Sequence, residues 1–411
     1  MVYVLNKNGN PLMPTGRYGK VRKMLKEGKA RVVCKMPFTI QLTCDSEEYL
    51  QPINLGIDTG SSYIGVSATT AKKEVYASQV ELRTDIQELI ATRRESRRAR
   101  RNRKTRYRKA RFNNRKRTEG WIAPSVRNKV DAHVTVIRRV KRILPISHIT
   151  IEVAQFDTQK IKNDAISGVE YQHGEQLGFW NVREYVLARD GHKCQHCKGK
   201  SKDPILNVHH IESRKTGGNA PNNLITLCET CHKAYHKGAI KLKIKRGTSL
   251  RDAAIMGIMR WCVYNKAKET FGNVSLTYGY ITKNTRIRNG VAKTHVADAR
   301  CISGNPTAKP LSFYYVEKLI RRHNRQTHRY KILKGGVRKL NQCPYETKGY
   351  RLFDVVRWQG KEWLVKSRRV RGTFLLQVLG GTERKDGVSY KKLLLVRKSR
   401  GRIICKNLNE I

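Results

Sequence analysis

Two short runs, CQHC at residues 194–197 and CETCHKAYH at residues 228–236, enclose the segment NVHHIE at residues 207–212. Each run contains a pair of cysteines separated by two residues, which is the spacing of a clip in which four thiolates hold one zinc ion tetrahedrally. The expected ligands of this structural zinc ion are Cys194, Cys197, Cys228 and Cys231. The sequence therefore predicts a small zinc-stabilised domain here.

Histidines lie inside and beside the cysteine frame, where a purely structural zinc site does not need them. His209 and His210 are adjacent, and His232 and His236 are four residues apart. A nuclease needs one imidazole to hold a divalent cation against a phosphate and another to take a proton from water. The frame resembles that of the HNH (ββα-metal) endonucleases. The alternative is a plain zinc ribbon with incidental histidines.

The charge of the chain indicates its partner. The 411 residues include 85 Lys and Arg against 32 Asp and Glu, a net charge of +53. This is far more than solubility requires, and it implies a long polyanion such as duplex DNA, structured RNA or both. Charge alone leaves open an RNA-packaging protein without catalytic chemistry.

Cysteine usage and hydropathy bear on the compartment. Ten cysteines are present, four of them in the zinc frame and the others scattered, which is typical of a reducing environment. The N-terminus lacks the pattern of a signal peptide, and no apolar run approaches the length of a membrane span. We therefore expect a soluble, intracellular protein.

Three carboxylates outside the zinc frame fall on an α/β pattern. Asp58 follows an apolar strand and precedes a glycine, Glu152 interrupts a second apolar strand, and Asp298 lies three residues after His295. Carboxylate oxygens are the ligands that Mg²⁺ prefers, and two such ions catalyse in-line attack on a phosphodiester. The sequence predicts a magnesium site here, with His295 as a base or water-positioning group. The alternatives are a hairpin-capping aspartate and a structural histidine.

A dense run of cations follows the first acidic motif. Between residues 93 and 117, 15 of 25 residues are Lys or Arg, without an intervening Gly or Pro. We expect a helix laid along a nucleic-acid backbone, although a disordered basic segment is the alternative. The expected contacts are Arg93, Arg94, Arg97, Arg98, Arg100, Arg101, Arg103, Arg106, Arg108 and Arg111.

The C-terminal part of the chain changes character. Residues 319–334 form a second basic run, and short strands separated by turn residues follow from residue 349 to residues 403–405. This spacing predicts a small basic β-barrel or β-sandwich. The candidate nucleic-acid contacts, for which a merely solvated basic face is the alternative, are Arg321, Arg322, Arg325, Arg368, Arg369 and Arg371.

Five motifs together resemble the IscB family, transposon-encoded RNA-guided nucleases that are related to the CRISPR effector nucleases. They are PLMP at residues 11–14, LGIDTGSS at 55–62, RRARR at 97–101, TIEVAQFD at 150–157 and THVADAR at 294–300. The resemblance implies a multidomain α/β protein, with a split RNase H-like (RuvC) core and an inserted HNH domain.

The resemblance also implies domain boundaries. These are a PLMP module at 1–50, RuvC part I at 51–83, an arginine-rich bridge helix at 84–120, RuvC part II at 121–160, the HNH domain at 161–245, RuvC part III at 246–305, a basic RNA-contacting segment at 306–348 and a β domain reading the target-adjacent motif at 349–411.

Residue roles follow from the same resemblance. Asp58, Glu152 and Asp298 are expected to hold two Mg²⁺ ions, with His295 assisting, to cut the non-target strand. One further Mg²⁺ in the HNH domain would serve the target strand. Its site is expected to contain His209 and His232 as ligands, His236 as a further ligand, His210 as the base and Asn223 as the residue that fixes the loop. His209 stands where many family members have Asp, which bears on the choice of metal.

The implied activity is RNA-guided double-strand cleavage of DNA next to a short motif. The partners would be a structured guide RNA (omega RNA) and double-stranded target DNA, bound by a protein monomer in the bacterial or archaeal cytoplasm or nucleoid. The alternative is an unguided HNH/RuvC nuclease of the homing or junction-resolving type. An unguided nuclease needs an element that recognises DNA bases directly, and the sequence shows no such helix or array of zinc fingers.

Overall fold

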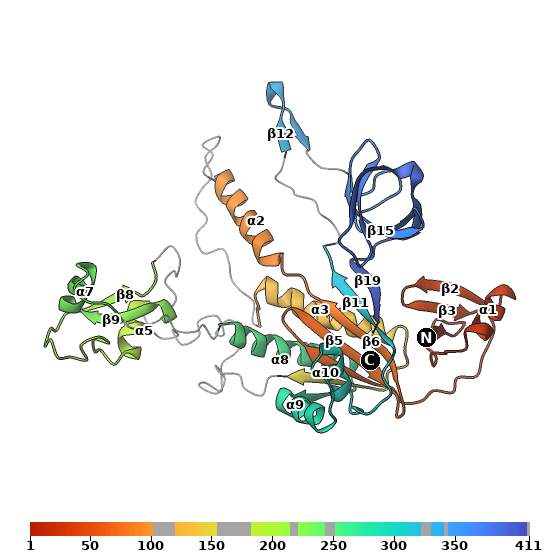
Figure 1. Ribbon diagram of the computed structural model, residues 1–411, viewed down its shortest axis with the longest axis horizontal. Coiled ribbons are helices and arrows are strands. Elements are labelled where there is room, and N and C mark those ends of the chain that lie inside the picture. Colours follow the sequence, from red (N-terminus) through yellow and green to blue (C-terminus); the bar gives the residue numbers. More distant parts are fainter. Residues whose placement is uncertain are drawn as a thin grey trace. The chain divides into compact units, whose positions relative to one another are not determined.

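The computed structural model describes residues 1–101, 120–153, 182–213, 221–242, 251–321, 330–340 and 344–408. The chain divides into two compact units (Figure 1). The first contains Met1–Ala110, Pro124–Gln155 and Met259–Ile411, and the second contains Arg111–Ala123 and Phe156–Ile258. In the described residues, no helix is both long and apolar enough to cross a membrane.

The first unit is built on a seven-stranded sheet in the order β10-β7-β4-β5-β6-β11-β19. The central strands β4 (Asn54–Thr59), β5 (Tyr63–Thr69) and β6 (Glu74–Glu81) form an antiparallel meander. On one side β7 (His148–Val153) and β10 (Val274–Tyr278) run parallel to β4. The mixed α/β class predicted from the sequence is therefore confirmed.

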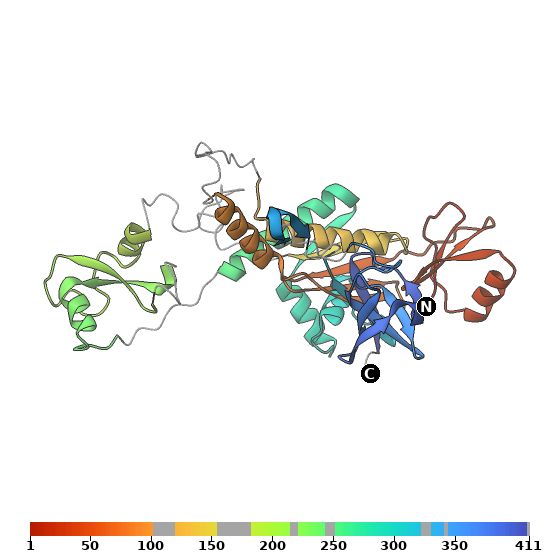
Figure 2. The same ribbon diagram turned by 90° about the horizontal axis from the view of Figure 1, so that it is seen from above.

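Helices cover both faces of this sheet. The central strands are buried almost throughout, which requires a cover on each side. Helix α3 (Pro124–Lys141) lies on one face and helix α10 (His295–Ile302) on the other (Figure 2). The apolar stripe of α3, which includes Val130, Val134 and Ile137, is buried.

Two glycines let α10 approach the sheet closely. A Cβ atom at Gly56 would lie 2.0 Å from the carbonyl oxygen of Ala299, and one at Gly65 would lie 1.9 Å from that of His295. Real Cβ atoms do not come so near to another heavy atom, so any side chain at either position would displace the helix. These glycines therefore fix the position of the helix that carries the THVADAR motif.

Three further helices lie wholly or partly in the first unit. Helix α8 (Arg251–Phe271) precedes strand β10, and helix α9 (Gly279–Arg288) follows it directly. Helix α2 (Ile86–Arg101) follows the meander and carries the start of the basic run.

The N-terminal module is a three-stranded sheet with one helix. Strands β1 (Tyr3–Leu5), β3 (Phe38–Leu42) and β2 (Ala30–Lys35) lie in that order, and helix α1 (Tyr18–Lys26) packs against them through Val21. Along the chain the module is therefore strand, helix, strand, strand.

The C-terminal β domain is a five-stranded sheet with its own core. Its order is β17 (Arg384–Ser389), β16 (Thr373–Val378), β15 (Lys361–Arg368), β14 (Val355–Trp358) and β18 (Leu394–Arg397). Trp363 and Phe374 are fully buried in it. The core position expected for Trp363 is confirmed. A separate hairpin pairs β12 (Tyr330–Ile332) with β13 (Arg338–Leu340).

Two strands correct the predicted organisation. From the sequence, residues 403–405 were expected in the small β domain, and residues 306–348 were expected to form a basic segment. Instead β11 (Phe313–Leu319) and β19 (Arg402–Leu408) pair with each other, and β11 joins β6 at the edge of the central sheet. Long-range pairing decides this assignment, and local sequence does not reveal it.

The second unit contains a short ββα arrangement. Helix α5 (Val182–Arg189) precedes strand β8 (Leu206–His210), which pairs antiparallel with β9 (Leu224–Cys228). A 3-10 turn at Pro221–Asn223 leads into β9, and helix α7 (Glu229–His236) follows at once. The two strands therefore bring the histidines of β8 next to those of α7.

Candidate active sites

The first candidate site lies where β4 and β7 end. These strands are parallel, so their carboxyl ends meet at the same edge of the sheet. Asp58 and Glu152 follow the last paired residues and are both buried. The hydroxyl of Thr59 donates a 2.6 Å hydrogen bond to the main-chain oxygen of Glu152, which ties the two strand ends together. The structure thus brings these two predicted ligands side by side.

Helix α10 supplies the other two predicted residues. Thr294 caps the helix by accepting a hydrogen bond from the main-chain nitrogen of Ala297, so His295 and Asp298 fall in its first turn. His295 Nδ1 lies 2.7 Å from Asp58 Oδ2. The ring of Tyr63 stacks on that of His295 with centroids 5.5 Å apart.

The electrostatics of the acidic site favour a bound cation. Burial and then the charge of Asp58 raise the pKa of Glu152, and the same two causes raise the pKa of Asp298. The hydrogen bond to Asp58 raises the pKa of His295. Carboxylates that repel one another in a half-buried site are stabilised by a divalent ion, so the residues fit the expected metal.

Two arginines that the sequence analysis missed also bind these carboxylates. Arg260 of α8 donates from Nε to the carbonyl oxygen of Thr59 at 2.9 Å, and its Nη2 lies 3.3 Å from Glu152 Oε1. Arg286 of α9 lies 3.1 Å from Asp298 Oδ1. Neither arginine belongs to a recognisable motif, so no local pattern indicates either contact.

The second candidate site gathers three histidines of the ββα arrangement. His209 of β8 and His232 and His236 of α7 place their ring nitrogens within 4.8 Å of one another. His209 is buried, and no hydrogen-bond partner of its Nε2 appears in the described part of the chain. Burial and the neighbouring histidines lower the pKa of His209 to about 4, which keeps the ring neutral and able to bind a metal. The structure therefore brings together all three histidines expected as ligands, His209, His232 and His236.

Asn223 holds the loop that follows the histidine pair. Its side-chain oxygen accepts a 2.9 Å hydrogen bond from the main-chain nitrogen of Glu212, and its amide donates a 3.0 Å bond to the main-chain oxygen of the same residue. The main-chain oxygen of Asn223 also accepts from Ile211 at 2.8 Å. This geometry agrees with the loop-fixing role expected for the residue. His210 is the last residue of β8, next to the loop so fixed.

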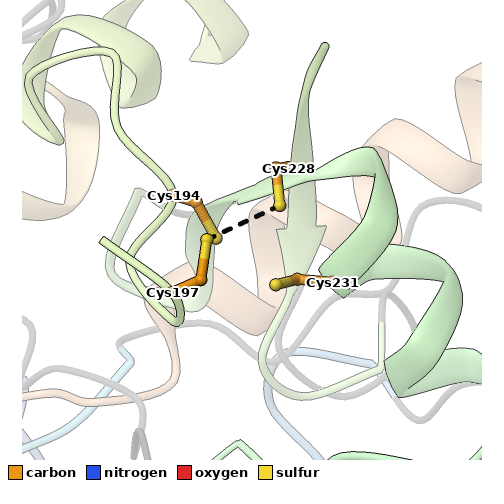
Figure 3. Close-up of side chains that lie close together, drawn as sticks. All are labelled: Cys194, Cys197, Cys228 and Cys231. Atoms are coloured by element: carbon orange, nitrogen blue, oxygen red, sulfur yellow. Dashed lines mark hydrogen bonds between the residues drawn. The ribbon is translucent and has the colours of Figure 1, made fainter. Parts of the chain in front are cut away.

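The four cysteines form a compact cluster (Figure 3). Cys197 Sγ and Cys228 Sγ lie 3.8 Å apart. Two thiolates that share a zinc ion at about 2.3 Å in tetrahedral geometry lie roughly 3.8 Å apart. The arrangement is compatible with structural zinc, as the sequence predicted.

The predicted nucleic-acid contacts have mixed outcomes. Arg93, Arg94 and Arg98 of α2 are exposed, and Arg97 is half-buried. The side chains of Arg100 and Arg101 lie outside the described part of the structure, as do the residues Arg103, Arg106, Arg108, Arg111, Arg322 and Arg325.

The arginines of the β domain and of its approach differ from one another. Arg321 is half-buried, and Arg371 is exposed. Arg369 is exposed and pairs with Asp386 at 2.6 Å. Arg368 corrects the prediction because it is buried and donates to the carbonyl oxygens of Tyr345 and Tyr350.

Two protein-family models match separate regions of the chain. A family model described as RRXRR protein matches residues 2–174, and one described as HNH endonuclease matches residues 194–238. Both matches support the resemblance to IscB-like nucleases. The HNH match spans all four cysteines and the three clustered histidines. The chain therefore contains a DNA endonuclease domain that uses metal ions.

The chain is also similar to single proteins over limited lengths. Anaredoxin from Nostoc sp. (strain PCC 7120 / SAG 25.82 / UTEX 2576) is 46% identical over 67 residues, 16% of this chain and 84% of that protein. A crystal structure of Streptococcus thermophilus Cas9 in complex with the AGAA PAM has a TM-score of 0.27 at 15% identity, over 44% of this chain and 26% of that one. A second structure of that Cas9, with the GGAA PAM, gives 0.30 at 14% identity, over 52% and 31%. This chain spans less than a third of the Cas9 chains.

Proposed function

We propose that this chain is an RNA-guided nuclease that cuts both strands of DNA with two separate metal sites. The observation that supports this most is that two sets of candidate metal ligands lie in two different compact units. One set is acidic and is carried by the central sheet and α10. The other is made of histidines and belongs to the HNH domain. A nuclease with one cut per binding event needs only one such set.

The acidic set would cut the non-target strand as a split RuvC core. Asp58, Glu152 and Asp298 would hold divalent magnesium, which supplies Lewis-acid activation of the phosphate and of water. His295 is held by Asp58 at 2.7 Å, so its ring is positioned to steady or deprotonate the attacking water.

The HNH domain would cut the strand that is paired with the guide. The three clustered histidines would hold a divalent ion against the scissile phosphate. His210, the last residue of β8, would take the proton from water. Asn223 keeps the following loop in place through its paired hydrogen bonds to Glu212. Loop and base therefore form one rigid element.

RNA guidance is the part of the proposal supported by charge. A net charge of +53 and the exposed arginines of α2, which would be the bridge helix, suit contact with a long RNA backbone. Such contacts carry no sequence information, so target choice would come from base pairing with the guide. The C-terminal β domain, with Arg369 and Arg371 at its surface, would read the short motif beside the target.

Strand-resolved cleavage tests the two-site proposal. With each strand of the target labelled separately, Glu152→Gln should abolish the non-target cut and keep the target-strand cut. His210→Ala should do the reverse. Loss of both cuts in either single variant, with the protein folded and RNA-bound, would show that the sites are not independent.

Sequencing of the nucleic acid bound to the protein from its native host tests guidance. One abundant structured RNA with a variable end is the expected result. Heterogeneous RNA, or DNA fragments alone, would instead support the unguided HNH/RuvC nuclease.

A further inference from the structure

The ligand set of the HNH site differs from the ligand set that magnesium prefers. The three donors brought together are imidazole nitrogens of His209, His232 and His236. In the described residues, no Asp or Glu oxygen joins this cluster within 4.8 Å. The neighbouring segment 214–220, RKTGGNA, contains no acidic residue either. The His, Cys, Asp and Glu donors gathered at this site in the described residues are therefore all imidazole nitrogens.

The spacing of two of the histidines suits a shared ion. His232 and His236 lie one helical turn apart on α7, and their Nε2 atoms are 3.3 Å apart. Two nitrogens that bind one ion at about 2.0–2.1 Å in tetrahedral geometry lie roughly 3.3–3.4 Å apart. The distance between Cys197 Sγ and Cys228 Sγ agrees in the same way with two thiolates that share one tetrahedral zinc ion.

The third histidine completes the set from the opposite element. The ring of His209 lies 5.2 Å from each of the other two rings, centroid to centroid, and meets both edge-on. Its buried Nε2 finds no partner in the described part of the chain. A buried polar atom without a partner is costly, and an ion bound between strand β8 and helix α7 would remove that cost.

Coordination chemistry then separates the two sites of the molecule. Magnesium is a hard cation that takes oxygen ligands, whereas imidazole suits zinc, cobalt, nickel and copper. The acidic site offers carboxylates and the HNH site offers nitrogen. One divalent ion does not suit both sets equally well.

We propose that the three-histidine site binds a first-row transition-metal ion of the zinc class in place of magnesium. The inference rests on the proposed function only in taking this site as the HNH metal site. It follows that the two cuts have different metal requirements. The HNH domain then holds two transition-metal ions, one structural in the cysteine clip and one in the nuclease site.

Metal content is the first test and does not depend on cleavage. The full chain with its RNA is loaded with Zn²⁺, dialysed in the presence of excess Mg²⁺ and analysed by elemental mass spectrometry. Wild type should retain two zinc ions per chain, and the double variant His232→Ala, His236→Ala should retain one. His192→Asn, which changes an exposed histidine of the same domain, should retain two. One ion per chain in wild type would overturn the proposal.

Absorption spectra of the cobalt-substituted protein distinguish loss of the histidine site from unfolding of the whole domain. When Co²⁺ replaces Zn²⁺, the cysteine clip gives thiolate charge-transfer bands, and the histidine site gives only weaker visible bands. The double variant should keep the former and lose the latter. If the wild-type and double-variant spectra are identical, then cobalt does not occupy the histidine site, and the proposal is wrong.

Strand-resolved cleavage gives the functional consequence. With the cysteine clip filled and only Mg²⁺ added, wild type should cut the non-target strand alone, and added Co²⁺ should restore the target-strand cut. His209→Asp introduces a carboxylate and should raise target-strand cutting in Mg²⁺ at least tenfold. Full target-strand cutting by wild type in Mg²⁺ alone would contradict the proposal while leaving the two-site function intact.

Discussion

Arg260 connects helix α8 to the acidic site at the scale of a single side chain. Its guanidinium binds both the carbonyl oxygen of Thr59 and the carboxylate of Glu152. We expect Arg260→Gln to slow the non-target cut on the order of 10- to 100-fold, because misplacing a ligand by a fraction of an ångström weakens transition-state stabilisation. Single-turnover cleavage of each labelled strand measures this.

The matched control for that prediction is Lys268→Gln. Lys268 is on the same helix but lies over the ring of Tyr264, 5.9 Å from its centroid. It should leave both cuts unchanged. Equal slowing of both strands by Arg260→Gln would mean that the residue supports the whole fold and not the acidic site.

His133 makes the central core sensitive to acid. The residue is fully buried in α3, and burial lowers its pKa from 6.5 to about 4. Between these values the unfolded chain binds a proton that the folded chain excludes, so stability falls as the pH drops from 6.5 towards 4. The contribution at full protonation of the unfolded state is at most about 3 kcal/mol.

A substitution isolates this contribution. His133→Leu should lose the acid-dependent part of the fall in stability within this window, measured as the difference in melting temperature between pH 7 and pH 5. If the variant and wild type show the same pH dependence, then His133 is not the group responsible.

The residues of the acidic site could be predicted from the sequence where they belong to a motif. Asp58, Glu152, His295 and Asp298 were named from strand ends and a helix start, and the structure brings them together. The arginines that bind these carboxylates were not named, because an arginine in an ordinary amphipathic helix gives no signal. Arg368 was taken for a surface contact because a basic cluster in sequence does not show which member is buried.

The contact between α10 and the sheet is a property of whole elements. A methyl group at Gly65 would meet the carbonyl oxygen of His295 at 1.9 Å, and backbone cannot yield cheaply. Gly65→Ala should therefore shift α10, abolish the non-target cut and destabilise the central unit by about 2 kcal/mol or more. Strand-resolved cleavage and thermal unfolding measure both effects.

Gly19→Ala is the comparison for this glycine. No atom lies within 4 Å of a Cβ atom placed at Gly19, which is in helix α1. Alanine there should stabilise the helix by roughly 0.5–1 kcal/mol and leave both cuts unchanged. If Gly65→Ala retained full non-target cutting, the close helix–sheet contact would not be needed for the acidic site.

Prediction from the sequence was more successful for local elements than for partners in a sheet. Strands marked by an apolar run, such as those that carry Asp58 and Glu152, were recognised from local sequence. Strands β11 and β19 were misassigned because each is short, and the only evidence for its place is a partner far along the chain.

At the scale of the molecule, the two units have separate cores, and we propose a separate metal site in each. The cluster around Cys194 and Leu227 belongs to the second unit alone. Cys228→Ser should therefore remove the target-strand cut and one calorimetric transition, while the non-target cut and the other transition remain. A single merged transition in wild type would contradict this independence.

The charge of the whole molecule predicts how RNA binding responds to salt. The affinity should fall steeply between low and physiological salt. The double variant Arg94→Gln, Arg98→Gln in α2 should reduce the slope of log affinity against log salt by roughly 1.4–1.8, at about 0.7–0.9 per lost phosphate contact. Filter binding over a salt series measures this, and an unchanged slope would remove these two arginines from the RNA interface.

Because β11 pairs with β19, the segment between Leu319 and Arg402 is an insertion that could be exchanged as a unit. Leu319 and Arg402 are partners in that antiparallel ladder, and Ile320 donates a hydrogen bond to the carbonyl oxygen of Gly401 at 3.1 Å. The chain therefore leaves the central sheet and returns to it at the same point. An engineer could cut at these two positions, graft the corresponding β domain of another nuclease and leave the catalytic sheet with all seven of its strands.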